Sequence, residues 1–278
     1  MIATVARGVS ALAFADLGVL GGAVGAFTGD LLRVRRAHVE HAMARAGVDA
    51  PAETARGMYA SLGTSFLEAL WLTGARRELG CVARFDAAAR GVLAEVRTRG
   101  VVLAASHTGN WEISSCSVAQ IAPLLVVTKH LSVGWVDAFW QAARGRYGVS
   151  IASASGAFEA ARRHVHARGM VAMMIDQVPL RRTHAMELPF LGAPAWVDRA
   201  PAMLAARTGA LYAVPVARRR NDGTQEILVL EAIAPPRRAT RAWVDDTTAR
   251  ATACLERFIL ANPTEWLWMH RRWKAPPS

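Results

Sequence analysis

The sequence predicts an α/β protein in which a single mixed sheet is flanked by helices and follows a helical N-terminal lead-in. From residue 91 onward, short β-branched or apolar runs alternate with helical stretches, which is typical of strands and helices wound into one sheet. Before residue 80 only helical patterns occur. Without a repeat or a low-complexity linker in the sequence, residues 81–278 are expected to form one compact core, and residues 1–80 an apolar membrane-associating segment and lead-in.

The first element is an apolar segment at residues 9–27. It carries Asp16 and several glycines and has only Arg7 ahead of it, so it predicts neither a good spanning helix nor a cleaved secretory signal. Arg33, Arg35 and Arg36 follow, which favours a segment that dips into the inner leaflet with its basic flank on anionic headgroups. We therefore expect attachment to the cytoplasmic face of the cytoplasmic membrane, peripherally or through this N-terminal segment. A buried, glycine-rich helical hairpin is the alternative.

Helical periodicity next predicts helices at 34–46 and 52–72, the second with a stripe that includes Met58, Leu62 and Phe66. The strand candidates of the core are five short apolar runs, at 101–105, 124–128, 170–175, 211–217 and 226–231. Helices are expected beside these strands at 135–147, 155–167, 199–208 and 247–261.

Composition narrows the classes of function. The chain has 278 residues, of which 53% are hydrophobic and 20% charged, so a disordered chain is excluded. A net charge of +11 predicts attraction to nucleic acid, anionic phospholipids or a phosphorylated substrate. The basic residues are dispersed and no nucleic-acid-binding module is recognisable, so a nucleic-acid partner is not expected. The mean hydropathy of +0.18 favours contact with lipid.

The main chemical signal is VVLAASHTGNWE at residues 101–112, where a predicted strand runs into a glycine-containing turn with His107 and Glu112. Histidine can take a hydroxyl proton at neutral pH, and a nearby carboxylate can hold its tautomer and stabilise the imidazolium. Alone, His-x4-Glu is a weak pattern, because a single histidine near a strand end is more often an ordinary hydrogen-bonding residue.

Further motifs in the same order add to this signal. Residues 106–112 (SHTGNWE) resemble the His-x4-Asp/Glu block of the lysophospholipid acyltransferase superfamily, and specifically of its lipid A biosynthesis lauroyl/myristoyl acyltransferase branch. The other similar stretches are RGRYG at 144–148, MMIDQVP at 173–179, PFLGAPA at 189–195, LAARTGALYAVP at 204–215 and NPTEWLWMHRRWK at 262–274. The resemblance therefore covers roughly residues 30–274.

This resemblance implies a glycerolipid acyltransferase-like fold and an O-acyltransferase. The donor would be an acyl thioester of acyl carrier protein or coenzyme A, and the acceptor a lipid hydroxyl, as in a lipid A precursor. His107 would be the base and Glu112 its orienting partner, with Asn110 or a backbone N–H of the turn as an oxyanion donor. Arg144 would contact an acceptor phosphate, and Asp176 and Gln177 would orient the acceptor or fix the loop. Neither a metal nor a redox cofactor is implied.

The C-terminal stretch mixes tryptophans with cations, which suits the interfacial zone of a membrane. Packing is expected for Trp266 and Trp268, and contact with lipid headgroups for Arg271 and Arg272.

Competing interpretations remain at this stage. Within the superfamily, the acceptor could instead be a glycosylated inositol phospholipid, a glycerophospholipid or an aminolipid. Outside it, the chain could be a basic, non-enzymatic protein that binds nucleic acid or a membrane surface. A serine hydrolase is disfavoured because ASASG at 152–156 lacks the first glycine of G-x-S-x-G. A metal hydrolase is disfavoured because His164, His166 and His184 lack convergent carboxylates.

Overall fold

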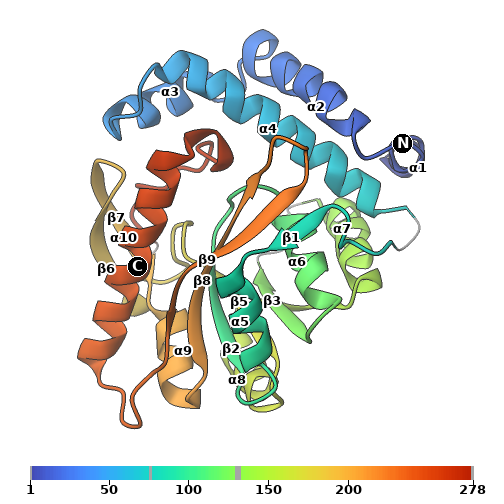
Figure 1. Cartoon of the computed structure of the whole chain (residues 1–278). Helices are drawn as coiled ribbons and strands as arrows, with labels where there is room; N and C mark the ends of the chain where they lie inside the picture. The colour runs from blue at the N-terminus through green and yellow to red at the C-terminus, as the bar shows by residue number, and fades with distance from the viewer. Residues whose placement is uncertain (1, 75–76, 129–132, 277–278) are drawn as a thin grey trace.

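The computed structural model describes residues 2–74, 77–128 and 133–276 (Figure 1). It confirms the predicted fold class, with a seven-stranded mixed sheet in the order β1-β9-β8-β2-β5-β3-β4. These strands are β1 (Ala83–Phe85), β2 (Val101–Ala105), β3 (Leu124–Thr128), β4 (Val149–Ser153), β5 (Met170–Met174), β8 (Leu211–Arg219) and β9 (Gln225–Ile233). A separate two-stranded sheet pairs β6 (Ala185–Phe190) with β7 (Ala193–Asp198).

Most neighbouring strands of the main sheet are parallel, and β8 and β9 form its antiparallel pair. In the centre, β2 pairs with β5 in a register that sets Ala105 opposite Met174. The carboxyl ends of these two strands therefore lie side by side at the same edge of the sheet. In open α/β sheets this is the edge where reacting groups gather.

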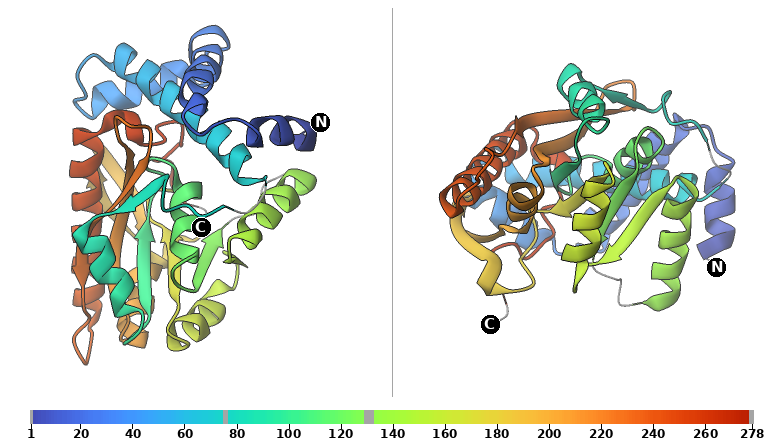
Figure 2. Two further views of the ribbon diagram at one scale, coloured as in Figure 1. Left: turned by 45° about the vertical axis from the view of Figure 1, so that its right-hand side comes forward. Right: turned by 90° about the horizontal axis from the view of Figure 1, so that it is seen from below.

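Helices cover both faces of the sheet (Figure 2). One face packs against α5 (Ala87–Glu95), α6 (Trp111–Ala119) and α7 (Gly134–Arg146). The other packs against α8 (Ala157–His166), α9 (Ala200–Thr208) and α10 (Arg241–Ala261). The strands are apolar on both sides because both faces are buried, as the unbroken run VVLAA of β2 predicts.

The N-terminal lead-in consists of α1 (Ile2–Ser10), α2 (Asp16–Ala26), a π-helical turn η1 (Phe27–Leu31), α3 (Arg36–Arg45) and α4 (Pro51–Leu72). Helix α4 is the long element beside which α1, α2 and α3 lie (Figure 1). Helices α2 and α4 approach closely because glycines face the contact: a Cβ atom on Gly21 would collide with the Thr64 backbone, and one on Gly25 with the Tyr59 carbonyl. The glycine-rich packing considered as the alternative is thus present on this side of α2.

The opposite side of this segment exposes apolar side chains. We call it the N-terminal apolar face: Val19, Leu20, Phe27, Leu31 and Leu32. The arginines that follow divide between two environments, since Arg33 and Arg35 are exposed, whereas Arg36 is buried and pairs with Asp30 and Glu40. The prediction of three headgroup-facing arginines is therefore wrong for Arg36.

Within the described ranges, no helix taken singly has the length and apolar character needed to cross a bilayer. The stretch Asp16–Leu31 meets that requirement only together with Arg36–Arg45, and the two are bent by 92°.

Most predicted core elements are present, and their ends differ by a few residues. The strands at 101–105 and 124–128 match the prediction. The last helix begins at Arg241 instead of 247, because the Thr240 side chain caps it by accepting from the Trp243 N–H. Strands β1, β4, β6 and β7 were not predicted: β1 is very short, β4 contains serines, and β6–β7 is a hairpin whose turn uses Leu191 and Gly192 at positive φ.

Candidate active site

The turn between β2 and α6, residues 106–110, lies at the carboxyl edge of the sheet. Gly109 is at φ 53°, and a side chain there would meet the Ala217 backbone, so the turn requires glycine. The Gly109 N–H donates to the Glu265 carbonyl at 2.7 Å. The turn is therefore held against β8 on one side and against the C-terminal part of the chain on the other.

His107 in this turn contacts Asp176, which follows the neighbouring strand β5. The His107 N–H donates to Asp176 Oδ2 at 2.8 Å, and Nδ1 of the ring lies 3.0 Å from Oδ1. The indole N–H of Trp266 donates to Oδ2 at 2.9 Å. Because the parallel pairing of β2 and β5 aligns the ends of both strands, residues 69 positions apart meet here.

The protonation state of Asp176 follows from its burial and from the charges around it. Asp176 is fully buried, which alone would raise its pKa, but the charge of His107 and the hydrogen bonds from it outweigh burial and hold the pKa of Asp176 well below its usual range. A carboxylate only accepts hydrogen bonds, so Nδ1 of His107 carries the proton that points to Asp176. In the neutral ring, Nε2 is then the nitrogen that can accept a proton.

Nε2 of His107 faces two further polar side chains. The amide Nε2 of Gln177 lies 3.2 Å from Nε2 of His107 and 3.4 Å from Nε2 of His270. The rings of His107 and His270 are 5.0 Å apart between centroids. Burial and the neighbouring His107 lower the pKa of His270 to about 4, against the opposing effect of Asp176, so His270 is neutral at pH 7.

Glu112 has a different partner from the one predicted. Its carboxylate is gripped by the guanidinium of Arg144, with Nε to Oε2 at 2.8 Å and Nη2 to Oε1 at 2.5 Å. None of the described hydrogen bonds joins Glu112 to His107; Asp176 occupies that position. The physical reason is that Glu112 lies in the first turn of α6 and reaches α7, whereas the ring of His107 turns toward β5.

The same pairing corrects the expectation for Arg144. Burial would lower the pKa of Arg144, but the hydrogen bonds and charge of Glu112 raise it. Arg144 therefore stays protonated, and the carboxylate of Glu112 balances its charge. Its third donor, Nη1, lies 3.4 Å from Gln141 Oε1. A guanidinium engaged in this way is not available to grip a phosphate with two parallel hydrogen bonds.

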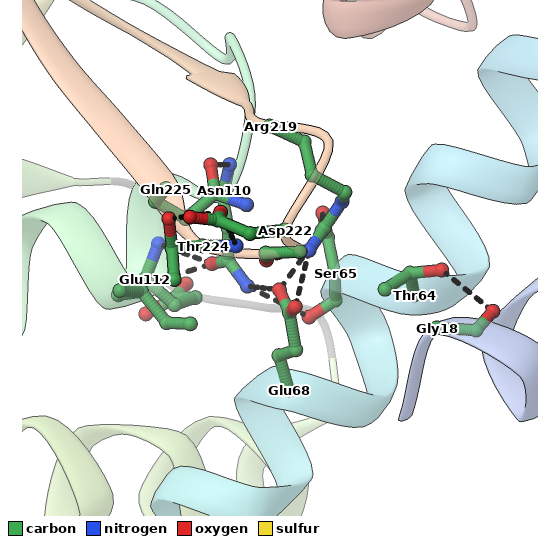
Figure 3. Close-up of polar contacts among 12 residues, drawn as sticks. Gly18, Thr64, Ser65, Glu68, Asn110, Glu112, Arg219, Asp222, Thr224 and Gln225 are labelled. Carbon is green, nitrogen blue, oxygen red and sulfur yellow. Dashed lines mark hydrogen bonds and ion pairs between the residues drawn. The ribbon is translucent and has the colours of Figure 1, made fainter. Parts of the chain in front are cut away.

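Asn110 also has a structural role, as the contacts in Figure 3 show. Its Oδ1 accepts from the N–H groups of Glu112 and Ile113 and thereby caps α6, while its Nδ2 donates to Glu68 at 2.7 Å. Glu68 on α4 is buried and also pairs with Arg219. Asn110 is thus a buried link between the turn and α4, not an oxyanion donor facing the site.

Three backbone N–H groups of the turn also donate to other parts of the protein. The N–H groups of His107, Gly109 and Asn110 donate to Asp176, to the Glu265 carbonyl and to Gln225 Oε1 respectively. These three N–H groups are therefore not available to a reacting oxygen, and a backbone oxyanion donor elsewhere in the turn stays a prediction.

The chain from 262 to 273, which we call the C-terminal strap, crosses the turn. Thr108 and Trp266 form an antiparallel bridge, and the Leu267 N–H donates to the His107 carbonyl at 3.2 Å. Trp266 and Trp268 are buried, as predicted from the alternation of the sequence. The strap therefore fixes both His107 and, through the Trp266 indole, Asp176.

The two arginines of the strap differ. Arg271 is exposed, and its contact with headgroups stays a prediction. Arg272 is 1% exposed, donates to the Trp196 carbonyl at 2.6 Å and lies over the ring of Phe190. Burial lowers its pKa to about 10. The prediction of a headgroup contact is wrong for Arg272, because its side chain packs under the β6–β7 hairpin.

A cavity of about 1120 Å³ opens from His107, and its wall reaches both faces of the sheet. On the face covered by α6 and α7, the wall is mainly apolar; we call this part the α6 arm, lined by Leu103, Val118, Leu124, Val126 and Trp140. On the other face we distinguish the α8–α9 arm, lined by Phe158, Met173, Pro201 and Met203. Gln177, His270, Glu112 and Arg144 line the same cavity, so a long substrate would pass the ring of His107.

The described residues include no group of three or more histidine, cysteine or carboxylate side chains placed to hold a metal ion. Of the predicted site residues, the structure brings His107, Asp176 and Gln177 together, and keeps Glu112 and Arg144 at the cavity as a pair. His270 was not among the predicted site residues. A sequence signal for the His107–Asp176 contact does exist. The apolar strands β2 and β5 each end two residues before an ionisable side chain, which is His107 after β2 and Asp176 after β5.

The family model described as bacterial lipid A biosynthesis acyltransferase matches residues 48–275. The match begins later than the region of resemblance in the sequence, which started near residue 30. No curated protein matches the chain.

Proposed function

The chain belongs to the bacterial lipid A biosynthesis acyltransferase family, and from this we propose that it transfers a fatty acyl chain from a thioester to a hydroxyl of a lipid A precursor. The observation that supports this chemistry is the His107–Asp176 pair at the centre of a long, largely apolar cavity. Such a pair makes an alcohol nucleophilic without a covalent enzyme intermediate.

In the proposed step, Nε2 of His107 takes the proton of the acceptor hydroxyl as its oxygen attacks the thioester carbonyl. The resulting tetrahedral intermediate collapses, the carbon–sulfur bond breaks, and the imidazolium returns the proton to the leaving thiolate. Asp176, ionised and hydrogen-bonded to Nδ1, stabilises the imidazolium between these events. Because Asp176 holds the ring from behind, Nε2 stays directed into the cavity.

Gln177 is proposed to position the acceptor. Its amide lies within hydrogen-bond distance of Nε2 of His107 and is held on the other side by His270. A hydroxyl that displaces the Gln177 amide from Nε2 of His107 would reach the base and have that amide beside it as a donor. His270, being neutral, can accept from the Gln177 amide without placing a positive charge beside the base.

The α6 arm is the proposed site of the acyl chain. Its lining side chains bury apolar surface, and each methylene of a substrate placed there gains about 0.8 kcal/mol on leaving water. The donor would be a thioester of acyl carrier protein or coenzyme A as co-substrate. The step as written uses no further cofactor, since the thiolate is itself a good leaving group.

The proposal is tested by incubating the purified chain with an acyl thioester and a lipid A precursor and measuring the lipid by mass spectrometry. We expect the precursor to gain the mass of one acyl group with release of one free thiol. The same assay with the precursor omitted measures thioester hydrolysis. Hydrolysis without any transfer, on lipid A precursors of several acylation states, would contradict the acyltransferase assignment.

We further propose that the chain associates with the cytoplasmic membrane surface through the N-terminal apolar face. Phe27, Leu31 and Leu32 are each more than half exposed, and Arg33 and Arg35 follow them. Exposed apolar side chains beside cations suit insertion at an anionic interface.

Replacing Phe27, Leu31 and Leu32 together with serine should weaken binding to anionic vesicles by at least about a hundredfold, because three apolar side chains no longer leave water. Vesicle co-sedimentation at low and high salt measures this effect. Ile121→Ser is the matched control, since Ile121 is 57% exposed but lies outside the N-terminal lead-in. Unchanged binding of the triple variant, or an equal loss in the control, would argue against this face.

A further inference from the structure

The wall of the cavity also has three exposed basic side chains, one of which, Arg207, lies beside Phe158 of the α8–α9 arm. Arg181, His184 and Arg207 line the cavity, are exposed, and come from two segments, the loop after β5 and the helix α9. We call them the basic rim. The proposed transfer step does not use them, because the base and its partners lie at the β2–α6 turn.

The two arginines of the rim carry uncompensated charge. In the part of the chain that the structure describes, neither Arg181 nor Arg207 makes an ion pair with a carboxylate, in contrast to Arg144 in the same cavity, which Glu112 neutralises. Besides Glu112, the carboxylates of the wall are Asp137, which is buried on α7, and Asp198, whose Oδ1 accepts from the Ala200 N–H at the start of α9. Two guanidinium groups without a carboxylate partner among the described residues, in one part of the wall, favour an anionic ligand there.

Part of the rim is held in place by neighbouring residues. The guanidinium of Arg207 lies 5.1 Å from the centroid of the Phe158 ring, so its plane rests on an aromatic face. The short turn that carries His184 is held by Arg199, whose N–H donates to the His184 carbonyl at 2.9 Å. The Arg207 side chain, held in this way, loses less conformational freedom when it binds a ligand than a solvated arginine does.

We propose that the basic rim binds a phosphate group of a substrate whose reacting end lies at His107. This inference rests on the proposed function, because it takes His107 as the reacting point of the cavity. Guanidinium groups bind phosphate oxygens through paired, charge-assisted hydrogen bonds. The α8–α9 arm is apolar enough to accept a flexible chain between the rim and His107. The phosphate has two sources: the phosphopantetheine arm of the thioester donor, or the phosphorylated sugar of the acceptor.

Binding measurements on the full-length His107→Ala protein test the rim without turnover. The probes are 4′-phosphopantetheine against pantetheine, and a phosphorylated glucosamine lipid against its dephosphorylated form, by calorimetry or fluorescence. Arg181→Gln and Arg207→Gln should each raise the Kd of the phosphorylated probe by about tenfold, the usual size of a charge-assisted contact, and leave the dephosphorylated probe unchanged. Arg163→Gln is the matched control, because Arg163 is exposed on α8 but does not line the cavity.

A loss confined to 4′-phosphopantetheine assigns the rim to the donor, and a loss confined to the glycolipid assigns it to the acceptor. Equal Kd values for the variants and the parent with both phosphorylated probes would overturn the proposal, as would an equal loss in Arg163→Gln. Binding is measured without transfer, so the two proposals can fail separately. An absence of acyltransferase activity would refute the proposed function, whereas the phosphate site is tested by these Kd values alone.

Discussion

Replacing His107 with alanine should lower kcat for acyl transfer by about a thousandfold, because a positioned general base contributes about 10²–10⁴-fold to rate. The ring lies at the end of β2, faces the cavity and packs on its polar side against Asp176, Gln177 and His270. Its loss removes the proton acceptor and little apolar core. The measurement is the steady-state rate of transfer at saturating thioester and acceptor, alongside circular dichroism and thermal unfolding.

The alanine variant leaves Asp176 with one fewer hydrogen-bond partner, so a second variant separates chemistry from folding. In His107→Asn, the side-chain amide can donate to Asp176 but cannot act as a base at neutral pH. We expect this variant to unfold near the temperature of the parent and to be as inactive as His107→Ala. Substantial turnover in either folded variant would rule out His107 as the base.

The second large effect is expected at Asp176. Asp176→Asn should lower kcat by about 10³–10⁴-fold, because the amide can donate to Nδ1 and thereby favour the tautomer with the proton on Nε2. The indole N–H of Trp266 can still donate to the remaining oxygen, so the fold around the strap should persist. The pH-dependence of kcat in the parent and the variant, measured by the same transfer assay, checks this expectation.

Glu112→Gln is the matched control, since it makes the same carboxylate-to-amide change at the other acidic residue of the site. We expect kcat to fall by no more than about tenfold, whereas stability should fall by about 3 kcal/mol, because Arg144 is left with an uncompensated buried charge. Urea unfolding measures the second effect. If Glu112→Gln were the more inactive of the two folded proteins, the roles assigned to the two carboxylates would be reversed.

The strands that the sequence predicts correctly are those with a continuous apolar run, such as VVLAA in β2 and LLVVT in β3. Burial on both faces makes these runs unmistakable. Strand β4, with the sequence VSIAS, is an edge strand of the sheet and has no such run. The β6–β7 hairpin was likewise missed, because its turn is formed by Leu191 at φ 51°, a conformation that its residue type does not predict.

The site was predictable only in part, for a similar reason. The sequence identifies His107 from local context, and it suggests Glu112 as a partner because the two are near in the chain. The actual contact depends on which strand pairs with β2, and that strand is β5, so the partner is Asp176. Pairing between strands far apart in sequence depends on the whole sheet and is not encoded in a local pattern.

Because the C-terminal strap is synthesised after the other residues of the site, it determines when the site is completed during synthesis of the protein. His107 meets Leu267, and Asp176 meets Trp266, so the site closes through residues synthesised long after the base itself. A nascent chain can pair β2 with β5 and still lack the bridge from Thr108 to Trp266. Contacts between residues this far apart in sequence form late because the loop between them must first be closed. The proposed acyl transfer would therefore require the strap to have docked on the turn.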